Sequence, residues 1–417
     1  MGFSPKTWVM ADVTILQVVP RLETGGSEQS TIEMAEALIR AGANALVATE
    51  GGRLASAVTR AGGEIIDLPM ASKHPVTMLA NARRLARLVE TRNISLLHAR
   101  SRAPAWSALL AARWTKRPLV TTYHGTYGNP GPVKAVYNSV MGRGDRVIAN
   151  SNYTANLIAT RQHVARDRIR IIYRGIDGAI FDPFVVPPGP VARLRESWGV
   201  APDKKIVLHA ARLSGIKGQR ETIEAVAELD DKGAFEDAIV VFAGEGLRGG
   251  YRQELADLIA EYGLQDKAML PGHCSDMPVA FLAAHTALVP SLVAETFGRT
   301  SIEAQAMGCP VIVSNIGALP ETIVSAESDA AGFTGYLVPP GDVPALADRI
   351  RAALALTPEE REKIGARARA RAGKNFELAQ MQAKTLAVYD ELLGTQLSQL
   401  FEHPPLYEPA ETAEGGA

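Results

Sequence analysis

The run ETFGRTSIE, residues 295–303, lies at the centre of the pattern that decides the fold. An apolar run before it, at 286–290, predicts a buried strand, and good helix formers after it lead to Gly308. A second buried strand is predicted at 310–313. Strand, helix and strand in this order form one unit of a parallel sheet. In such a unit the carboxyl end of the first strand and the first turn of the helix border the ligand crevice.

The loop within this unit has the composition of an anion site. The backbone N–H groups of residues 299–301 fall in the first helical turn, where they lack partners within the helix and favour a phosphate. Gly298 lets a ligand approach the backbone closely. Glu295 and Glu303 add a carboxylate at each end of the run. Taken alone, Glu295 could instead be a first-turn acid that the helix dipole favours, and Glu303 could be an exposed helical glutamate.

The spacing of Glu295 and Glu303, with Phe297 and Gly298 between them, resembles the E-x7-E signature of retaining family 4 glycosyltransferases. The resemblance implies the GT-B architecture, in which two Rossmann-like domains face each other across a cleft. It also implies that the first glutamate lies near the donor sugar and that the second binds the ribose hydroxyls of the nucleotide. The expected fold class is therefore α/β, with two doubly wound parallel sheets.

Alternating strand and helix patterns along the rest of the chain favour the same architecture. The proline and glycine cluster at 187–190 predicts a linker, because neither a helix interior nor a central strand tolerates it. Strands are predicted in the first half at 13–19, 44–49, 64–68, 94–98, 118–123 and 145–149. With the resemblance, the expected parts are an acceptor-binding domain at 1–186, a nucleotide-sugar-binding domain at 191–375, a helix at about 376–395 that crosses back onto the first domain, and a disordered tail at 402–417.

Three positions in the first half resemble family positions near the substrates. Gly25 and Gly26 resemble the G-G-x-E of the first loop, where the glycines let donor and acceptor approach; a plain tight turn is the alternative. His124 follows the strand predicted at 118–123, where a crevice ligand would lie. It matches a family histidine that contacts the transferred sugar, and a histidine that only caps a strand is the alternative.

Two cations in the second half resemble the family's R-x4-K-G, which holds the donor diphosphate. Arg212 and Lys217 bracket a short loop between a predicted strand and a predicted helix. Cleavage of a nucleotide sugar leaves negative charge on the diphosphate, and fixed cations stabilise that charge as it develops. The sequence contains no D-x-D. We therefore expect no metal and no cofactor, with a UDP- or GDP-linked sugar as the donor substrate.

Three further positions complete the comparison with the family. Residues 244–249 form a G-x-G-x-x-G, whose glycine spacing matches that of the dinucleotide-binding fingerprint. Because the family has a similar G-x-G turn here, we interpret Gly246 as part of a tight turn near the nucleotide and not as an NAD site. Gly272 belongs to a segment that lines the base in the family. Arg174 stands where the family usually has asparagine, which puts the polar contact of that asparagine in doubt.

Charge is distributed unevenly along the 417 residues. Residues 1–190 carry 23 Lys and Arg against 13 Asp and Glu, whereas residues 191–417 carry 21 against 32. A basic first half would suit an anionic acceptor or the anionic leaflet of the inner membrane, although a solvated basic face is the commoner explanation of the helical pattern at 80–92. No run of about 18 apolar residues occurs. We expect a cytoplasmic protein, with peripheral membrane contact at most and no nucleic-acid partner.

The expected function is the transfer of a sugar, with retention, from a nucleotide sugar to lipopolysaccharide core or another lipid-linked envelope glycan. Two other classes remain: an epimerase or hydrolase, which would convert the donor without an acceptor, and a nucleotide-sugar-binding protein, which would not need to neutralise a leaving group. The catalytic residues that the resemblance implies are Glu295, His124, Arg212 and Lys217. The implied donor-binding residues are Gly25, Gly26, Arg212, Lys217, Gly246, Gly272, Phe297, Gly298, Arg299, Thr300 and Glu303.

Overall fold

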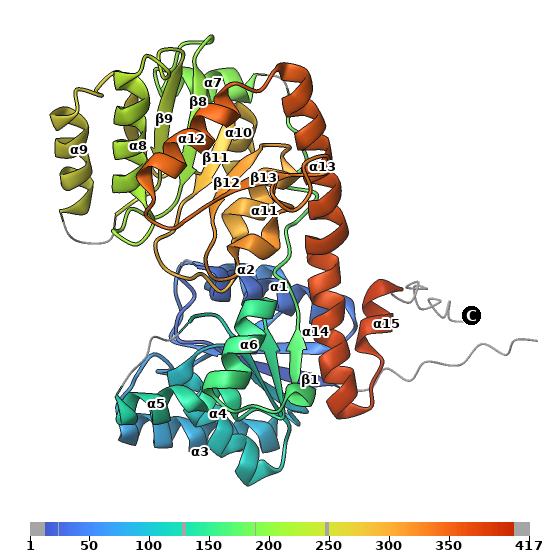
Figure 1. Ribbon diagram of the computed structural model, residues 1–417. Coiled ribbons are helices and arrows are strands. Elements are labelled where there is room, and N and C mark those ends of the chain that lie inside the picture. Colours follow the sequence, from blue (N-terminus) through green and yellow to red (C-terminus); the bar gives the residue numbers. More distant parts are fainter. Residues whose placement is uncertain (1–12, 24, 127–130, 188, 247–249, 404–417) are drawn as a thin grey trace, which may run out of the picture. The chain divides into compact units, whose positions relative to one another are not determined.

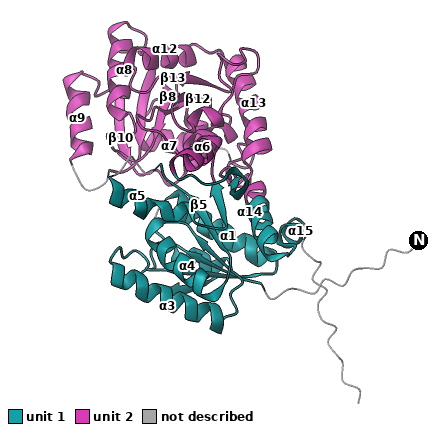
Figure 2. Ribbon diagram, turned by 60° about the horizontal axis from the view of Figure 1, so that its bottom comes forward, with its two compact units in different colours: residues 1–148, 162–170, 382–417 teal, residues 149–161, 171–381 magenta. Residues whose placement is uncertain are grey.

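The computed structural model describes residues 13–23, 25–126, 131–187, 189–246 and 250–403. Their contacts divide the chain into two compact units, which Figure 2 shows in teal and magenta. The first unit contains residues 1–148, 162–170 and 382–417, and the second contains residues 149–161 and 171–381. The expected first domain ends at 186, whereas these contacts group residues 149–161 and 171–186 with the second unit. Most of the expected tail, from residue 404 on, lies outside the described residues.

The first unit is built on a seven-stranded sheet in the order β3-β2-β1-β4-β5-β6-β7. Figure 1 labels β1 of this sheet and the helices α1 to α5 of the same unit. The pairs β2–β3, β1–β2, β1–β4 and β4–β5 are parallel. A strand that is covered on both faces needs apolar side chains on both, so its sequence is a continuous apolar run and does not alternate between apolar and polar residues. Their bounds are β1 (Thr14–Val18), β2 (Asn44–Thr49), β3 (Glu64–Asp67), β4 (Leu96–Ala99), β5 (Leu119–Tyr123), β6 (Arg146–Ala149) and β7 (Ile169–Ile171).

Helices cover this sheet, and the last long helix of the chain is tied to it by polar groups. The Tyr389 hydroxyl lies 2.6 Å from Nδ1 of buried His98, and the Gln382 amide donates to the carbonyl of Glu33 at 2.7 Å. The helix that carries these two residues is the one predicted at about 376–395. The helices are α1 (Gly26–Arg40), α2 (Ala55–Arg60), α3 (Pro75–Thr91), α4 (Arg102–Thr115), α5 (Pro132–Ser139), α14 (Leu378–Leu393) and α15 (Leu397–Glu402).

The second unit contains a six-stranded parallel sheet in the order β10-β9-β8-β11-β12-β13. The strand order reverses between β8 and β11, and a doubly wound sheet of this kind binds its ligands outside the carboxyl ends of the strands at such a point. The strands are β8 (Lys205–Ala210), β9 (Ala238–Ala243), β10 (Ala268–Gly272), β11 (Thr286–Val289), β12 (Val311–Ser314) and β13 (Gly335–Val338).

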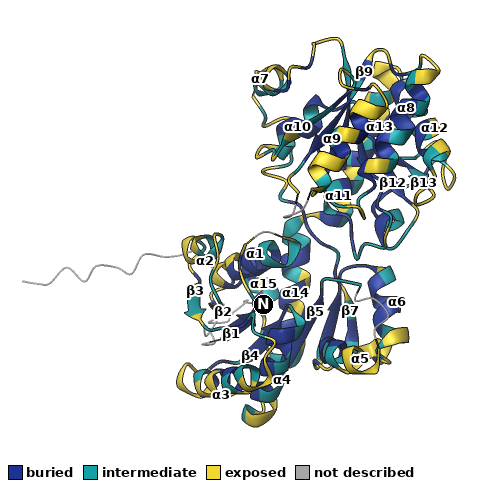
Figure 3. Ribbon diagram, turned by 90° about the vertical axis from the view of Figure 1, so that its left-hand side faces the viewer, coloured by how far each residue is buried: buried dark blue, intermediate teal, exposed yellow. Residues whose placement is uncertain are grey.

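Two apolar cores cover the two faces of the second sheet. One core joins the sheet to α8, α9 and α12, and the other joins it to α7, α10 and α11. Figure 3 shows most of this sheet in the dark blue of buried residues, whereas the edge strand β10 is mostly intermediate or exposed. This layering confirms the predicted α/β class. The helices of this unit are α6 (Asn152–Arg161), α7 (Pro190–Ser197), α8 (Gln219–Asp231), α9 (Tyr251–Glu261), α10 (Met277–Ala283), α11 (Arg299–Ala306), α12 (Val343–Leu354) and α13 (Pro358–Phe376).

Candidate functional site

The two loops that leave β8 and β11 bring a predicted cation and a predicted acid together. Lys217 Nζ lies 2.8 Å from Glu295 Oε1, and each side chain is 23% exposed. Both residues follow the carboxyl ends of their strands, on either side of the point where the strand order reverses. The roles expected from the sequence, Lys217 at the donor diphosphate and Glu295 near the donor sugar, stay predictions. Arg212, in the same loop as Lys217, is exposed.

Gly218 fixes the position of the Lys217 loop against the loop after β11. Its φ is +79°, a left-handed conformation that favours glycine, and a Cβ there would lie 2.1 Å from the carbonyl oxygen of Pro290. The N–H of Leu292 donates to the carbonyl of Ile216 at 3.0 Å, which joins the same two loops. The glycine of the R-x4-K-G motif is therefore required for the close approach of these loops.

Besides Lys217, two residues hold Glu295: Ser291 contacts its carboxylate, and Ala318 contacts its backbone. The Ser291 hydroxyl donates to the same Oε1 that pairs with Lys217. The N–H of Ala318 donates to the carbonyl of Glu295 at 3.0 Å. Gly317, with φ of +65°, lets this chain segment pass so closely that a Cβ would lie 2.7 Å from the Glu295 nitrogen. Sequence reasoning missed Ser291 and Gly317, and only the position of Gly317 shortly after a strand could have indicated it.

The second acid of the motif lies on α11 and pairs within its own helix. Arg299 Nε donates to Glu303 Oε1 at 3.1 Å, and the Glu303 side chain is 16% exposed. Gly298 is the N-cap residue of α11 and supplies no side-chain cap, and Thr300 lies in the first turn of this helix. Binding of an anion by the N–H groups of this turn stays a prediction. A Cβ at Gly298 would lie 2.7 Å from Leu319 Cδ2, so a larger residue there would require that leucine side chain to shift.

Phe297 serves the fold with its side chain. It is 5% exposed, and its ring centroid lies 5.9 Å from that of Tyr173 and 5.7 Å from that of Phe376. This aromatic cluster joins the loop to residues 173–181 and to the end of α13. A contact of Phe297 with a donor stays a prediction, and its backbone is the part best placed for it.

The loop is also tied to the start of α6. The Asn150 amide donates to Thr296 Oγ1, and the Thr154 hydroxyl donates to the carbonyl of Thr296, each at 3.2 Å. Glu321 accepts hydrogen bonds from the N–H groups of Asn152 at 2.8 Å and Tyr153 at 2.7 Å, so it caps α6 with both oxygens. These contacts are the physical reason why residues 149–161 group with the second unit.

The other two predicted donor-binding glycines of the second unit, Gly246 and Gly272, lie near the carboxyl ends of β9 and β10. Gly246 forms an isolated parallel bridge with Leu213, and it is exposed. The carbonyl of Gly272 accepts the N–H of Gly244 at 2.8 Å, and its φ of +89° requires glycine. Residues 247–249, which complete the formal G-x-G-x-x-G, lie outside the described residues. Donor binding at Gly246 and Gly272 stays a prediction.

In the first unit, the predicted residues lie at the carboxyl edge of its own sheet. Gly25 is the N-cap residue of α1, with φ of +148°, and Gly26 is the first residue of that helix. A Cβ at Gly25 would lie 2.7 Å from Glu28 Oε2. His124 directly follows β5 and is half-buried. The rest of its glycine-rich loop, at 127–130, lies outside the described residues.

Arg174, where the family usually has asparagine, is 7% exposed. Gly175 beside it packs so closely on α14 that a Cβ would lie 2.4 Å from Leu378 Cα. Among the described residues, no group of three or more His, Cys, Asp or Glu side chains is arranged to hold a metal ion. The expectation of a metal-independent enzyme stays a prediction.

Two family models match most of the chain. The model for glycosyltransferase family 4 matches residues 24–179, and the model for glycosyl transferases group 1 matches residues 191–371. A crystal structure of a glycosyltransferase from Rickettsia africae is 33% identical, with a TM-score of 0.82, and the match covers 92% of this chain and 100% of that one. The chain therefore belongs to the glycosyltransferases, with a family 4 domain followed by a group 1 domain.

A curated relative, the D-inositol 3-phosphate glycosyltransferase of Saccharomonospora viridis, is 30% identical over 261 residues. The match covers 61% of this chain and 57% of that protein, so the chain spans little more than half the length of the curated relative.

Two solved structures share the fold at lower identity. One is HepE of Anabaena in complex with UDP and glucose, at 24% identity and a TM-score of 0.76, with 91% of this chain and 99% of that chain covered. The other is WaaG, a glycosyltransferase involved in lipopolysaccharide biosynthesis, at 16% identity and a TM-score of 0.68, with 91% and 100% covered. These likenesses confirm the expected GT-B fold class.

Proposed function

We propose that this chain transfers a sugar, with retention of configuration, from a nucleotide-sugar donor to a phosphorylated envelope glycan. The observation that carries the proposal is the contact of Lys217 Nζ with Glu295 Oε1 at 2.8 Å, where the strand order of the second sheet reverses. A cation for a leaving diphosphate and an acid for a sugar are needed within a few ångströms of each other, because the bond that breaks lies between those two groups.

The donor binds to the second unit in this proposal. Arg212 and Lys217 hold the diphosphate, and the N–H groups at the start of α11 add neutral donors to it. Glu303 binds the ribose hydroxyls. The UDP and glucose in the structure of HepE support a UDP-linked hexose as the first donor to test, with a GDP-linked sugar as the second.

The reaction proceeds on one face of the sugar. The bond from the anomeric carbon to the diphosphate oxygen breaks, the acceptor oxygen bonds to the same face, and the acceptor proton moves to a diphosphate oxygen. Lys217 and Arg212 stabilise the charge left on the diphosphate, which is the role a metal ion has in other enzymes. Glu295 stabilises the positive charge that develops at the anomeric carbon, and His124 contacts the transferred sugar.

The acceptor is proposed to be anionic, such as the phosphorylated core of lipopolysaccharide. The curated relative is named for an inositol phosphate acceptor, and WaaG is described as involved in lipopolysaccharide biosynthesis. The excess of cations in residues 1–190 supports an anionic acceptor, because opposite charges attract.

The surface of the first unit supports an encounter with a membrane that carries such an acceptor. On α5, Val133 is 85% exposed and Val136 is 58% exposed, and Figure 3 shows this helix largely in yellow. On α3, Val76 is 69% exposed, beside the exposed arginines of residues 83–87. Apolar and basic side chains together favour an anionic interface. No helix in the described ranges is long and apolar enough to span a bilayer. We propose peripheral contact at the cytoplasmic face of the inner membrane.

Incubation with a panel of UDP- and GDP-linked sugars tests the proposal, with and without a phosphorylated glycan acceptor. We expect glycosylated product only when both substrates are present, at the same rate in excess chelator. Conversion of the donor at full rate without acceptor would instead identify an epimerase or hydrolase, and donor binding without turnover would identify a binding protein. Loss of transfer on chelation, restored by magnesium or manganese, would contradict the role given to Arg212 and Lys217.

A sedimentation assay tests the membrane contact separately. We expect binding to vesicles that contain anionic lipid at low salt and release at high salt, because exposed charges are screened within about 8–10 Å at physiological ionic strength. No binding at low salt would restrict the basic surface to soluble acceptors.

A further inference from the structure

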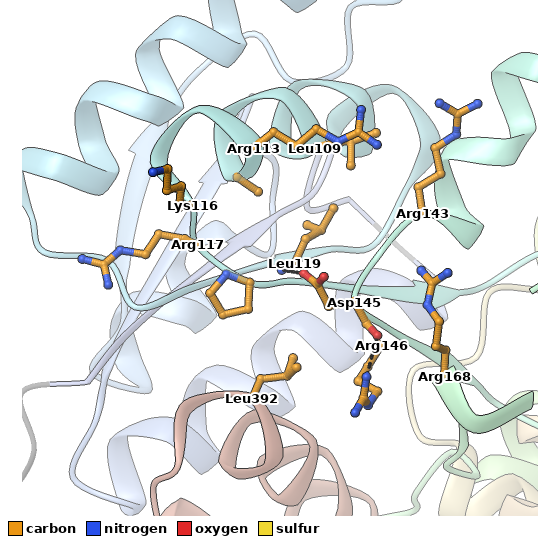
Figure 4. A pocket seen from close by; sticks show the side chains of 12 residues that line it. Leu109, Arg113, Lys116, Arg117, Leu119, Arg143, Asp145, Arg146, Arg168 and Leu392 are labelled. Atoms are coloured by element: carbon orange, nitrogen blue, oxygen red, sulfur yellow. Dashed lines mark hydrogen bonds between the residues drawn. The ribbon is translucent and has the colours of Figure 1, made fainter. Parts of the chain in front are cut away.

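A basic cavity of about 760 Å³ lies in the first unit, at the amino-terminal edge of its sheet (Figure 4). It is bordered by the end of α4 and by the residues that begin β5 and β6 and precede β7. His124 lies at the other end of β5, and five residues of strand, at about 3.3 Å each, separate the two ends. The cavity is therefore distinct from the carboxyl edge where this sheet would meet a substrate. Its cations are Arg113, Lys116, Arg117, Arg143, Arg146 and Arg168.

Among the described residues, most of these positive charges have no acidic partner. Arg146 is the exception, because its Nε and Nη2 donate to Glu391 Oε1 at 2.9 and 2.6 Å. Arg168 donates to the backbone carbonyls of Gly142 and Gly144, which are neutral and leave its charge in place.

The side chains at the end of α4 are the least engaged. Within the described part of the chain, those of Arg113, Lys116 and Arg117 form no hydrogen bond or ion pair. Asp145, the one acid among the lining residues, accepts the N–H of Leu119 at 2.8 Å and so has a backbone partner. Figure 4 shows Lys116 and Arg117 on one side of Leu119 in this view, with further arginines on the other side. An excess of cations around one hollow is an arrangement that an anion stabilises.

The backbone at Lys116 adds an independent observation. Lys116 is the C-cap residue of α4, with φ of +54°. Glycine is the usual residue in this left-handed conformation, because a Cβ is disfavoured there. Cations also complement the carboxyl end of a helix, which accounts for Arg113 and for part of the presence of Lys116. This interaction with the end of α4 does not account for Arg143 and Arg168, which come from other elements and line the same cavity.

We propose that this cavity binds a phosphorylated ligand that carries two or more negative charges, separate from the donor and acceptor of the transfer reaction. Arginine forks match phosphate oxygens with paired hydrogen bonds, and several such groups are available here. The apolar side chains of Leu109, Leu119 and Leu392 also line the cavity and admit a nonpolar part beside the phosphates. A free phosphorylated metabolite and the phosphorylated headgroup of a lipid share this chemistry.

Calorimetric titration of the full chain with inorganic pyrophosphate tests the proposal. Pyrophosphate could also bind near Lys217, so the titration is made in a Lys217→Gln background, in which the proposed donor site is impaired. We expect binding to persist there, and to weaken at least tenfold when Arg113→Gln or Arg117→Gln is added. Arg60→Gln serves as the matched control, because Arg60 is exposed on α2, outside the cavity and outside the membrane surface proposed on α3 and α5. Pyrophosphate binding that does not depend on Arg113 and Arg117 would overturn the proposal.

Lys116→Gly separates a ligand role from a structural one. Glycine relieves the left-handed backbone, so we expect the melting temperature to rise by about 2 °C while pyrophosphate binding weakens. Lys116→Gln keeps a Cβ in the left-handed backbone, so its melting temperature should not rise, and it should weaken pyrophosphate binding about as much as Lys116→Gly does. If Lys116 served only the end of α4, Lys116→Gly would leave pyrophosphate affinity unchanged, and that result would contradict the proposal.

Vesicles distinguish the two sources of the phosphate. Sedimentation is compared for vesicles of phosphatidylcholine with and without phosphatidic acid. Binding that requires phosphatidic acid and that Arg117→Gln reduces, but Arg60→Gln does not, assigns the cavity to a lipid headgroup. Pyrophosphate binding that depends on Arg117, with vesicle binding that does not, assigns it to a free metabolite. If neither probe binds in a way that depends on Arg113 and Arg117, the cavity has no phosphate ligand.

Discussion

Lys217 and Glu295 form an ion pair across the two loops that a donor would have to approach. Their side chains are each 23% exposed. In the proposed reaction, an incoming diphosphate would take over the ammonium group of Lys217 and leave the Glu295 carboxylate facing the sugar. Ser291 remains as a donor to Glu295 when that exchange occurs.

Glu295→Gln is expected to lower kcat by about 100-fold or more, with a smaller change in the donor KM. Positive charge develops at the anomeric carbon only as the bond to phosphate breaks, so the carboxylate acts mainly in the transition state. Steady-state kinetics against donor and acceptor measures both constants, and thermal melts check that the variant is folded. A change in KM alone would make Glu295 a binding residue.

Glu303→Ala is expected to raise the donor KM and to leave kcat nearly unchanged. A ribose contact scarcely changes between the ground state and the transition state, so its loss removes uniform binding. The variant also removes the carboxylate that lies 3.1 Å from Arg299 Nε, so thermal melts check that it is folded. A fall in kcat as large as that of Glu295→Gln would show that the two acids do not have separate roles.

The local structure of this site could be predicted from the sequence because its signals are local. The apolar run at 310–313 predicts β12, which is observed one residue later at Val311–Ser314. The helix predicted at 80–92 begins earlier, at Pro75, because proline suits the first turn of a helix. Helix starts of this kind are visible in the sequence once proline is considered as a first residue.

The contacts that shape the site could not be predicted, because they depend on how distant loops meet. Lys217 and Glu295 are 78 residues apart in the chain, and the resemblance indicated their neighbourhood but not their pairing. Glu321 and Gly317 belong to no motif, and only the folded chain brings them to α6 and to Glu295. The close packing of Gly175 on the start of α14, next to buried Arg174, likewise follows no local pattern.

Gly218→Ala is expected to destabilise the second unit and to impair transfer. Its left-handed φ costs about 1–2 kcal/mol for alanine, and the Cβ 2.1 Å from the Pro290 carbonyl oxygen adds a further cost of about 1–3 kcal/mol for overpacking. Because Lys217 precedes this residue, the displaced loop should also raise the donor KM. Denaturant unfolding and steady-state kinetics measure the two effects.

Gly263→Ala is the matched control for this prediction. Gly263 has φ of +68°, but a Cβ there would meet no atom of the described residues within 4 Å. We expect Gly263→Ala to lose only the stability that the left-handed backbone costs an alanine, and to keep full activity. Equal losses of stability in the two variants would mean that the Pro290 contact relaxes easily and that Gly218 serves only the turn.

The unfolding free energy is expected to depend on pH through His209. This histidine is buried in β8, its Nδ1 lies 3.1 Å from Thr222 Oγ1, and burial lowers its pKa from 6.5 to about 3. Because the folded state disfavours the protonated ring, the unfolded chain binds the proton more readily below pH 6.5. Stability is therefore complete above pH 6.5 and falls as the pH decreases toward about 3, by about 1.4 kcal/mol per pH unit for this residue.

His209→Gln removes this titration while keeping a polar group near Thr222. Denaturant unfolding at pH 7.5 and pH 5 measures the free energy of each protein, and we expect the wild type to lose about 2 kcal/mol more than the variant between these values. Other groups titrate over the same range, so the difference between the two proteins is the quantity that decides. His163→Gln, at an exposed position, controls for the loss of a histidine as such. Parallel pH profiles for the wild type and His209→Gln would show that water reaches the ring and that His209 is not held neutral by burial.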